Sequence, residues 1–264
     1  MSVRSRQQRL LQHVNTVGVA SVAELARLCG VSEMTIRRDV DHLDRSKLLM
    51  KVKGGAQRLE EVVRFHEAHL RTRMTMNVAS KQRIAARAAG LIAAGDTIFL
   101  DGSTTIICLA RLLAQTDQEI TVVTNSVLVE LELAGAKNIR LIGLGGIFDH
   151  ETFSLCPMDE GADLAGCHVK KAFLSCTAFA VEEGTFENST FNMAIKRRVA
   201  RSAETICLLV DVSKLGQKAL HRVLDTGDID VLVTEDSLED AALDALSRRG
   251  VAVYLIGSGE HVGA

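Results

Sequence analysis

Residues 31–40 are Val-Ser-Glu-Met-Thr-Ile-Arg-Arg-Asp-Val, and this stretch decides the fold of the first part of the chain. Its apolar side chains recur at the spacing of one helix face, at Ile36, Val40 and the following Leu43. Ser32 stands where its hydroxyl can cap the start of that helix. Gly30 suits the positive φ that a tight turn between two helices requires. The stretch therefore predicts the second helix of a helix-turn-helix.

The residues on either side predict the rest of a small DNA-binding module. An apolar helix face is formed by Leu10, Leu11, Val14 and Val17, and Gly18 ends that helix. Ser21 can cap a second helix over residues 22–28. After the third helix, residues 47–55 alternate lysines with apolar residues and end in a glycine pair, which is typical of a basic β-hairpin wing.

The distribution of charge indicates what this module binds. Residues 1–58 hold 11 Lys/Arg and 5 Asp/Glu, a net charge of +6, whereas the remaining residues carry −8. A basic module on an acidic body indicates a polyanion partner, with the helix contacting bases and the wing contacting phosphates. The candidate DNA-binding residues are Ser32, Met34, Thr35, Arg37, Arg38, Lys51 and Lys53. A three-helix protein-interaction module is the alternative, which the charge of +6 disfavours.

The segment from Val31 to Val40, followed by Gly54-Gly55-Ala56, resembles the N-terminal module of the DeoR family of bacterial repressors. The resemblance implies a winged helix-turn-helix domain over residues 1–56 that binds a double-stranded DNA operator. One small module per chain offers few contacts to DNA. We therefore expect a homo-oligomer, a dimer or a tetramer, on repeated or palindromic half-sites.

Length and composition exclude several other classes of protein. The 264 residues fit one domain of about 200 residues plus a small partner. A hydrophobic share of 47% with 24% charged residues excludes bulk disorder. No apolar run spans a bilayer and no signal peptide is visible, so we expect a cytoplasmic protein without a membrane partner. Six scattered cysteines without C-x-x-C argue against a zinc ribbon and a disulfide scaffold.

Residues 57–80 are polar and charged, and they predict a linker of helical or irregular structure. His66 and His69 lie here at a spacing that could share a metal ion. Exposed linker histidines are the favoured interpretation, because no cysteine or further histidine lies nearby. The sequence therefore predicts no metal site, and it predicts no cofactor.

From residue 81 onward, short apolar strands alternate with helices. This alternation predicts an α/β effector-binding domain over residues 81–264, built on a doubly wound, mostly parallel sheet. The predicted strands are 97–100, 121–124, 139–142, 172–174, 206–210, 231–233 and 251–256. The predicted helices include 84–92, 104–113, 194–203 and 238–248.

Polar loops follow four of the predicted strands, at the end of the sheet where such folds bind ligands. Asp101-Gly102-Ser103-Thr104-Thr105 opens a helix, where hydroxyls and free N–H groups favour an anion such as phosphate. The candidate effector-binding residues in these loops are Asp101, Gly102, Ser103, Thr104, Thr105, Asn125, Ser126, Gly145, Gly146 and Lys214. Each loop alone also fits ordinary turn chemistry.

With Lys81 and Asp211-x-Ser213-Lys214-x-Gly216 added to these loops, the body resembles the effector domain of the DeoR family, which is similar to ribose-5-phosphate isomerase. The resemblance implies a repressor of a carbohydrate-utilisation operon that is released by a phosphorylated sugar or sugar derivative. It adds Lys81 to the effector-binding residues. It implies that residues 102–105 hold the phosphate and that Lys214 reaches the ligand.

The body departs from the family at Lys170-Lys171, where an Asp usually precedes the Ala-Phe pair. Residues 175–179 are also not rich in glycine, and Cys156-Pro157 stands where a glycine is usual. We expect the lysines to alter the non-phosphate end of the ligand site and to leave it without the carboxylates that sugar-phosphate isomerisation needs. The sequence therefore predicts binding without turnover and no catalytic residues.

Three alternatives to a sugar-phosphate-responsive repressor remain. One is a sugar-phosphate isomerase-like enzyme with a DNA-binding head. Another is an NAD(H)-sensing repressor, suggested by Gly143-x-Gly145-Gly146, although this lacks the full dinucleotide-binding spacing. The third is a structural DNA-bridging protein with a vestigial pocket.

Overall fold

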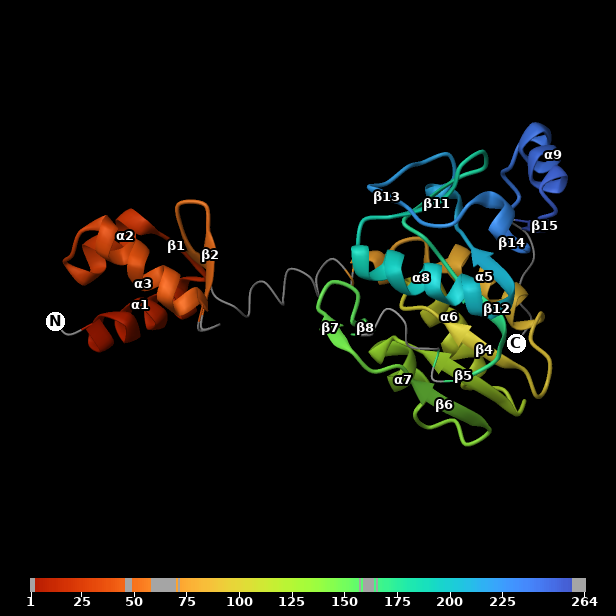
Figure 1. Ribbon diagram of the computed structural model, residues 1–264, viewed down its shortest axis with the longest axis horizontal. Helices are drawn as coiled ribbons and strands as arrows, with labels where there is room; N and C mark the ends of the chain where they lie inside the picture. The colour runs from red at the N-terminus through yellow and green to blue at the C-terminus, as the bar shows by residue number, and fades with distance from the viewer. Residues whose placement is uncertain are drawn as a thin grey trace. The chain divides into compact units, whose positions relative to one another are not determined.

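The computed structural model describes residues 3–45, 49–57, 70, 72–156, 158, 164 and 166–257. The chain divides into two compact units, Met1–Arg71 and Thr72–Ala264 (Figure 1). Residues 72–80, expected in the linker, therefore belong to the second unit. Several residues of the sequence-based predictions lie outside the described residues: Lys47 and Leu48 of the wing, residues 58–69 and 71 of the linker, which include His66 and His69, and Pro157.

The described part of the first unit is a small helical module with a sheet. Its elements are α1 (Val3–Val17), β1 (Val19–Ser21), α2 (Val22–Cys29), α3 (Glu33–Arg45), β2 (Met50–Val52) and β3 (Gly55–Gln57). A capping box begins α2, because Ser21 Oγ accepts from the Glu24 N–H and the Glu24 carboxylate accepts from the Ser21 N–H. Gly30 ends α2 in the left-handed conformation, at a φ of +64°. The predicted helix-turn-helix is confirmed.

The inward face of α3 lies in the core of the first unit. The buried apolar residues of that face, packed with α1 and α2, are Ile36, Val40 and Leu43. Asp39 is also buried, and its carboxylate accepts hydrogen bonds from Arg6 Nε at 2.5 Å and Gln7 Nε2 at 3.0 Å. The ion pair with Asp39 raises the pKa of Arg6 above its usual value. Asp39 therefore ties α1 to α3 and is not available to a ligand.

The predicted wing is a hairpin of β2 and β3 with its turn at Lys53-Gly54. A third strand, β1, pairs with β3 on the other side, so the sheet order is β1-β3-β2. The sequence did not predict β1, because three residues are too few for alternation to be visible.

The second unit is an α/β domain around a seven-stranded sheet. Its elements are α5 (Val78–Ala89), β4 (Thr97–Leu100), α6 (Thr104–Leu113), β5 (Ile120–Thr124), α7 (Val127–Leu133), β6 (Ile139–Gly143), β7 (Ile147–Asp149), β8 (Ser154–Cys156), β9 (Val169–Leu174), β10 (Ala178–Ala180), β11 (Gly184–Glu187), α8 (Thr190–Ser202), β12 (Ala203–Leu209), η1 (Val212–Lys214), β13 (His221–Arg222), η2 (Thr226–Asp228), β14 (Val231–Glu235), α9 (Asp240–Arg248) and β15 (Ala252–Ile256).

The large sheet has the strand order β15-β14-β12-β9-β4-β5-β6, and every neighbouring pair in it is parallel. Helices cover both faces: Ile98 and Leu100 pack in one cluster with α5 and α6, and Phe99 packs in another with α8. The predicted doubly wound fold is confirmed. The order of strands reverses between β4 and β9, and the carboxyl ends at such a switch point form a crevice.

Two small β-structures in the second unit were not predicted from the sequence. They are the hairpin β7–β8 and the antiparallel sheet β10-β11-β13. Their strands are two to four residues long, which is too short for a clear alternation of apolar and polar residues.

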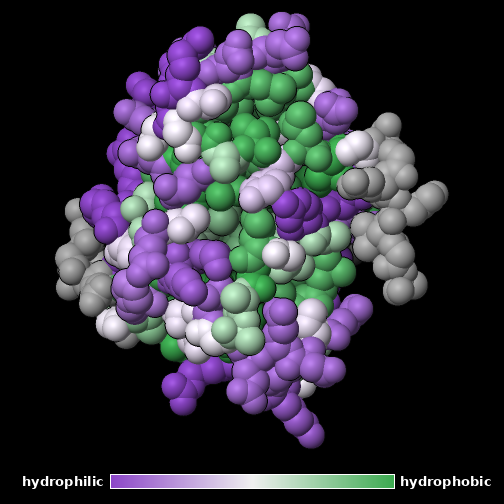
Figure 2. Space-filling model, turned by 90° about the vertical axis from the view of Figure 1, so that its right-hand side faces the viewer, coloured by the Kyte–Doolittle hydropathy of each residue, from purple (hydrophilic) through white to green (hydrophobic). Residues whose placement is uncertain are grey.

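Figure 2 shows the side of the second unit on which Figure 1 labels α9 and β15. Hydrophobic side chains gather in the middle of this face, with hydrophilic ones around them. β15 is an edge strand, and its sequence Ala-Val-Tyr-Leu-Ile has none of the charged residues that usually protect a free edge. Within the described residues, no helix is long and apolar enough to cross a membrane.

Candidate functional sites

The exposed face of α3 carries two arginines and an apolar side chain. Met34 is 62% exposed, and Arg37 and Arg38 are also exposed. Arg37 Nη2 lies 3.5 Å from Glu33 Oε2, but both side chains are 54% exposed, so the pair is weak and opens readily. This face can therefore present two guanidinium groups to a base edge or a phosphate.

Ser32 and Thr35 lie at the start of α3 and bond to each other. The Thr35 N–H donates to Ser32 Oγ at 3.3 Å, and the two hydroxyl oxygens are 3.0 Å apart. These contacts cap the helix, as the sequence predicts for Ser32.

The two described wing lysines, Lys51 and Lys53, are exposed. Lys51 Nζ donates to Asp41 Oδ1 of α3 at 2.6 Å, and the Lys51 N–H donates to Asp44 Oδ1 at 2.9 Å. Both side chains of the Lys51–Asp41 pair are about half exposed, so a DNA phosphate can replace Asp41 at little cost. Lys53 stands in the turn of the wing.

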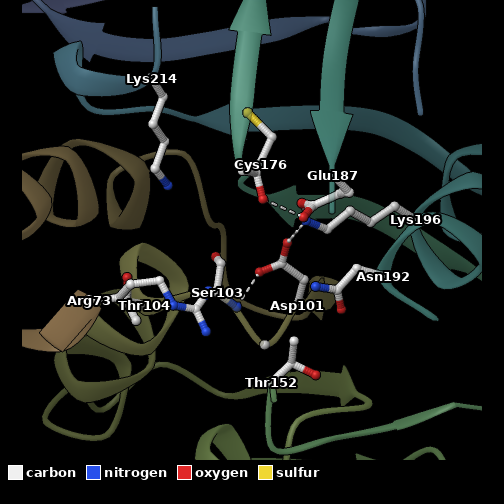
Figure 3. A pocket seen from close by; sticks show the side chains of 12 residues that line it. Arg73, Asp101, Ser103, Thr104, Thr152, Cys176, Glu187, Asn192, Lys196 and Lys214 are labelled. Atoms are coloured by element: carbon white, nitrogen blue, oxygen red, sulfur yellow. Dashed lines mark hydrogen bonds and ion pairs between the residues drawn. The ribbon is translucent and has the colours of Figure 1, made fainter. Parts of the chain in front are cut away.

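A cavity of about 120 Å³ lies in the second unit at the carboxyl ends of β4 and β9 (Figure 3). Its lining residues are Arg73, Asp101, Gly102, Ser103, Thr104, Thr152, Cys176, Thr177, Glu187, Asn192, Lys196 and Lys214. Five of the predicted effector-binding residues line it: Asp101, Gly102, Ser103, Thr104 and Lys214. The cavity stands at the switch point of the sheet, where this fold class binds ligands.

Asp101 links the loop after β4 to the loop after β9 at the base of the cavity. Its Oδ1 accepts from the Ser103 N–H at 2.8 Å and its Oδ2 from the Ser175 N–H at 2.9 Å. Lys196 Nζ lies 3.2 Å from Oδ2, and Asp101 is 1% exposed. The carboxylate therefore orders the loops after β4 and β9, and its remaining acceptor capacity is small.

The start of α6 forms one side of the cavity. Ser103 is the N-cap residue but makes no side-chain capping bond, and its buried Oγ has no partner among the described residues. A Cβ at Gly102 would clash with Ser154 Oγ, so a larger residue here would require the Ser154 side chain to move. Free N–H groups, an unused hydroxyl and the helix dipole all favour an anion here.

Two cations reach the cavity beside α6. Lys214, on η1, donates from Nζ to Ser175 Oγ at 3.2 Å and lies 3.9 Å from Asp211 Oδ2. Arg73, just before α5, donates from Nη2 to the Glu151 carbonyl of the hairpin loop at 3.3 Å. Neither cation is in a short ion pair, so both are available to a phosphate.

Lys81 supports the cavity without lining it. Its Nζ donates to the carbonyl oxygens of Arg73 and Met76, and the residue is 4% exposed. Burial lowers the pKa of Lys81, and the nearby Lys214 lowers it further. Lys81 therefore holds the segment that carries Arg73 against the cavity.

The other predicted effector-binding residues lie outside the cavity lining. Thr105 is fully buried in α6, and its Oγ1 has no partner among the described residues. Asn125 Nδ2 donates to the Leu155 carbonyl, and Ser126 forms a β-bridge with Ser154, so these two hold the β7–β8 hairpin in place. Gly145 and Gly146 are exposed after β6, an edge strand two positions from β4.

The sequence missed the side of the cavity formed by β11 and α8. Glu187 ends β11, and Asn192 and Lys196 lie on α8. Lys196 Nζ donates to the Glu187 carboxylate and, at 2.7 Å, to the Ser175 carbonyl. Burial disfavours the ammonium form, but the charges of Glu187 and Asp101 outweigh it and raise the pKa of Lys196. No motif marks these residues in the sequence.

Cys176, after β9, also lines the cavity and is 4% exposed. Burial raises the pKa of its thiol to about 12. The group is therefore a neutral thiol at physiological pH and not a nucleophile.

The expectation for Lys170 and Lys171 is wrong. Both lysines lie at the amino end of β9, where their Nζ atoms donate to Asp96 at 2.7 and 2.5 Å. The cavity lies at the other end of β9, after Leu174. The expectation that the ligand site lacks carboxylates is also wrong, because Asp101 and Glu187 both line the cavity.

Comparisons with known proteins match both units. The family model described as "DeoR-like helix-turn-helix domain" matches residues 6–62, and that described as "DeoR C terminal sensor domain" matches residues 76–236. The HTH-type transcriptional regulator YulB of Bacillus subtilis (strain 168) is 34% identical over 256 residues, covering 97% of this chain and 98% of that protein. The L-fucose operon activator of Haemophilus influenzae is 32% identical over 237 residues, covering 89% and 93%.

Among solved structures, ribose 5-phosphate isomerase A from Methanocaldococcus jannaschii matches at 20% identity. The match covers 51% of this chain and 53% of that chain, with a TM-score of 0.38.

Proposed function

This chain belongs to the DeoR family of DNA-binding transcriptional regulators, and we propose that it represses a carbohydrate-utilisation operon until a phosphorylated sugar or sugar derivative releases it from DNA. The observation that carries the proposal is the cavity at the switch point of the sheet. It combines the unsatisfied start of α6 with two cations, Arg73 and Lys214, which together suit a phosphate. Hydroxyl-binding groups stand beside them, at Asn192 and Thr177.

We propose that α3 enters the major groove of the operator and that the wing contacts phosphates. The exposed Arg37 and Arg38 support base contacts, because a guanidinium can bond two acceptors of a guanine. Lys51 and Lys53 support phosphate contacts, which position the module without selecting a sequence.

We further propose that the regulator acts as a homo-oligomer, a dimer or a tetramer, on repeated or palindromic half-sites. One helix-turn-helix per chain offers too few contacts for tight specific binding. The apolar edge strand β15 is a surface that a second copy of this chain can cover. A monomer on its operator at working concentration would contradict this proposal.

Binding without turnover is favoured over an isomerase-like enzyme. Both carboxylates that line the cavity, Asp101 and Glu187, pair with the ammonium of Lys196, so the described lining offers no carboxylate outside an ion pair to act as a general base. Turnover of ribose 5-phosphate by the purified protein would revive the enzyme alternative.

An NAD(H)-sensing repressor is disfavoured by the position of the glycine loop that suggested it. Gly145 and Gly146 follow the edge strand β6 and do not line the cavity.

The decisive experiment is fluorescence anisotropy on the DNA upstream of the protein's own gene, at fixed salt, with a panel of sugar phosphates. The expected result is tight binding that one phosphorylated sugar abolishes and its unphosphorylated parent does not. The double variant Thr104→Ala/Lys214→Ala is expected to bind DNA and to lose the response. Lys218→Ala is the matched control, because Lys218 is exposed and does not line the cavity.

Binding that no metabolite changes would contradict the effector proposal and favour a DNA-bridging protein. Absence of DNA binding even at low salt would contradict the repressor proposal as a whole. If the double variant still responded to the effector, the effector site would lie elsewhere than in this cavity.

A further inference from the structure

The two sides of the cavity differ in charge. In Figure 3, Arg73, Thr104 and Lys214 lie on one side of Asp101, and Glu187, Asn192 and Lys196 lie on the other. The first side holds the start of α6 and two cations, which suit a phosphate. The second side, which we name the β11–α8 side, is built by Glu187, Asn192 and Lys196, with Asp101 at its boundary.

The β11–α8 side carries a net charge of −1. It holds two carboxylates, Asp101 and Glu187, against the single ammonium of Lys196, and all three are 4% exposed or less. The Lys196 ammonium has three donors, and it bonds the Glu187 carboxylate and the Ser175 carbonyl while pairing with Asp101. Lys196 therefore has no donor left for a ligand, although it is a cation that lines the cavity.

The cations on the first side are too few to serve a second anion. Arg73 and Lys214 are the lining cations outside the buried cluster of Lys196. Lys214 also lies 3.9 Å from Asp211, which is 1% exposed and takes part of its charge. A phosphate of charge near −2 uses both cations. A carboxylate or a second phosphate on the same ligand would face the carboxylates of Glu187 and Asp101 without a free cation to pair with.

We propose that Glu187 makes this cavity select monophosphates whose other end is neutral or cationic, and exclude sugar bisphosphates and phosphorylated sugar acids. This inference rests on the proposed function, because it assigns the class of the phosphorylated ligand. Glu187 Oε2 accepts one hydrogen bond, from Thr177 Oγ1 at 2.8 Å, and a carboxylate oxygen can accept a second from a ligand hydroxyl or ammonium group. The Asn192 carboxamide adds a donor and an acceptor beside it.

The test is isothermal titration calorimetry with four ligands of equal carbon number. They are glucosamine 6-phosphate, glucose 6-phosphate, 6-phosphogluconate and glucose 1,6-bisphosphate. The full-length protein is expected to bind each of the first two at least about tenfold more tightly than either of the last two, because buried like charges repel strongly. The amino sugar is expected to bind most tightly of the four.

Variants separate charge from shape. Glu187→Gln keeps the shape and makes the β11–α8 side neutral, so the preference for glucose 6-phosphate over 6-phosphogluconate should fall at least about tenfold. Glu187→Gln/Lys196→Met restores a net charge of −1 through Asp101, and the preference should return. Glu204→Gln is the matched control, because Glu204 pairs with the exposed His168 and does not line the cavity. Circular dichroism and thermal unfolding check that each variant is folded.

Equal or tighter binding of 6-phosphogluconate or the bisphosphate by the wild-type protein would overturn the inference. Lack of binding by all four ligands would overturn it as well. If Glu187→Gln preferred glucose 6-phosphate over 6-phosphogluconate as strongly as the wild type does, Glu187 would not be the residue that selects the ligand. If a phosphorylated sugar still released the protein from DNA in these cases, the proposed function would stand without the inference; if no phosphorylated sugar released it, the proposed function would fail first.

Discussion

Asp96→Asn is predicted to destabilise the second unit by about 2.5 kcal/mol at pH 7. Asp96 is 2% exposed between the amino ends of β4 and β9, and accepts hydrogen bonds from Lys170, Lys171 and the Ala93 N–H. Burial alone would raise the pKa of Asp96, but these donors outweigh it and lower the pKa from 3.8 to about 2. At about 1.36 kcal/mol per pKa unit, this fall corresponds to about 2.5 kcal/mol.

The pH dependence follows from the direction of that shift. A carboxyl group with a lower pKa in the folded state stabilises the fold above its unfolded pKa, and this contribution is lost as the pH falls through the folded pKa. The difference between wild type and Asp96→Asn should therefore be complete at pH 7. It should shrink between about pH 5 and about pH 2.

Urea unfolding followed by tyrosine fluorescence measures this difference. Tyr254 is the single tyrosine of a chain without tryptophan, and it lies in β15, so the signal reports on the second unit. Lys171→Met should cost more than Lys170→Met, because the Lys171 side chain is 18% exposed and the Lys170 side chain 51%. A loss below about 0.5 kcal/mol at pH 7 would refute the reasoning. So would an equal loss at pH 7 and pH 3.

Three further predictions concern function. Arg37→Ala or Arg38→Ala should weaken operator binding by about 1–3 kcal/mol if the arginine contacts a base, and unchanged anisotropy in both would contradict the assigned recognition helix. Lys53→Ala should weaken binding to all DNA sequences alike and reduce the slope of log affinity against log salt by about 1, whereas a sequence-dependent loss would argue against a phosphate contact. Gly102→Ala should abolish the response to the effector, because the added Cβ clashes with Ser154 Oγ; a normal response in folded protein would show that the loop has room to move.

Local patterns in the sequence were sufficient for most helices and strands. The i, i+4, i+7 spacing of Ile36, Val40 and Leu43 predicted the buried face of α3, because a helix turns once every 3.6 residues. Short continuous apolar runs predicted the strands of the large sheet, because a strand with helices on both faces is buried on both sides. The short strands of β7–β8 and β10-β11-β13 were not predicted, because a segment of two to four residues is too short to show an alternation of apolar and polar side chains.

The order of strands decided which polar loops form the cavity. The loops after β4, β9 and β12 meet there because these three strands are neighbours in the sheet. Gly145 and Gly146 follow β6 at the sheet edge, and they stay outside although their composition resembles that of the other loops. Composition cannot distinguish these loops, because it says nothing about which strands lie side by side.

The sequence by itself determined the helix-turn-helix and the strands of the large sheet, and it predicted an anion-binding loop at residues 101–105, since each depends on neighbours within a few residues along the chain. Only the tertiary structure decided that Lys170 and Lys171 lie away from the cavity and that Glu187 and Lys196 line it. The end of the sheet at which a residue lies depends on how distant strands pair. The ion pair between β11 and α8 likewise depends on how these two elements pack in the folded domain. Such long-range contacts leave no local period in the sequence.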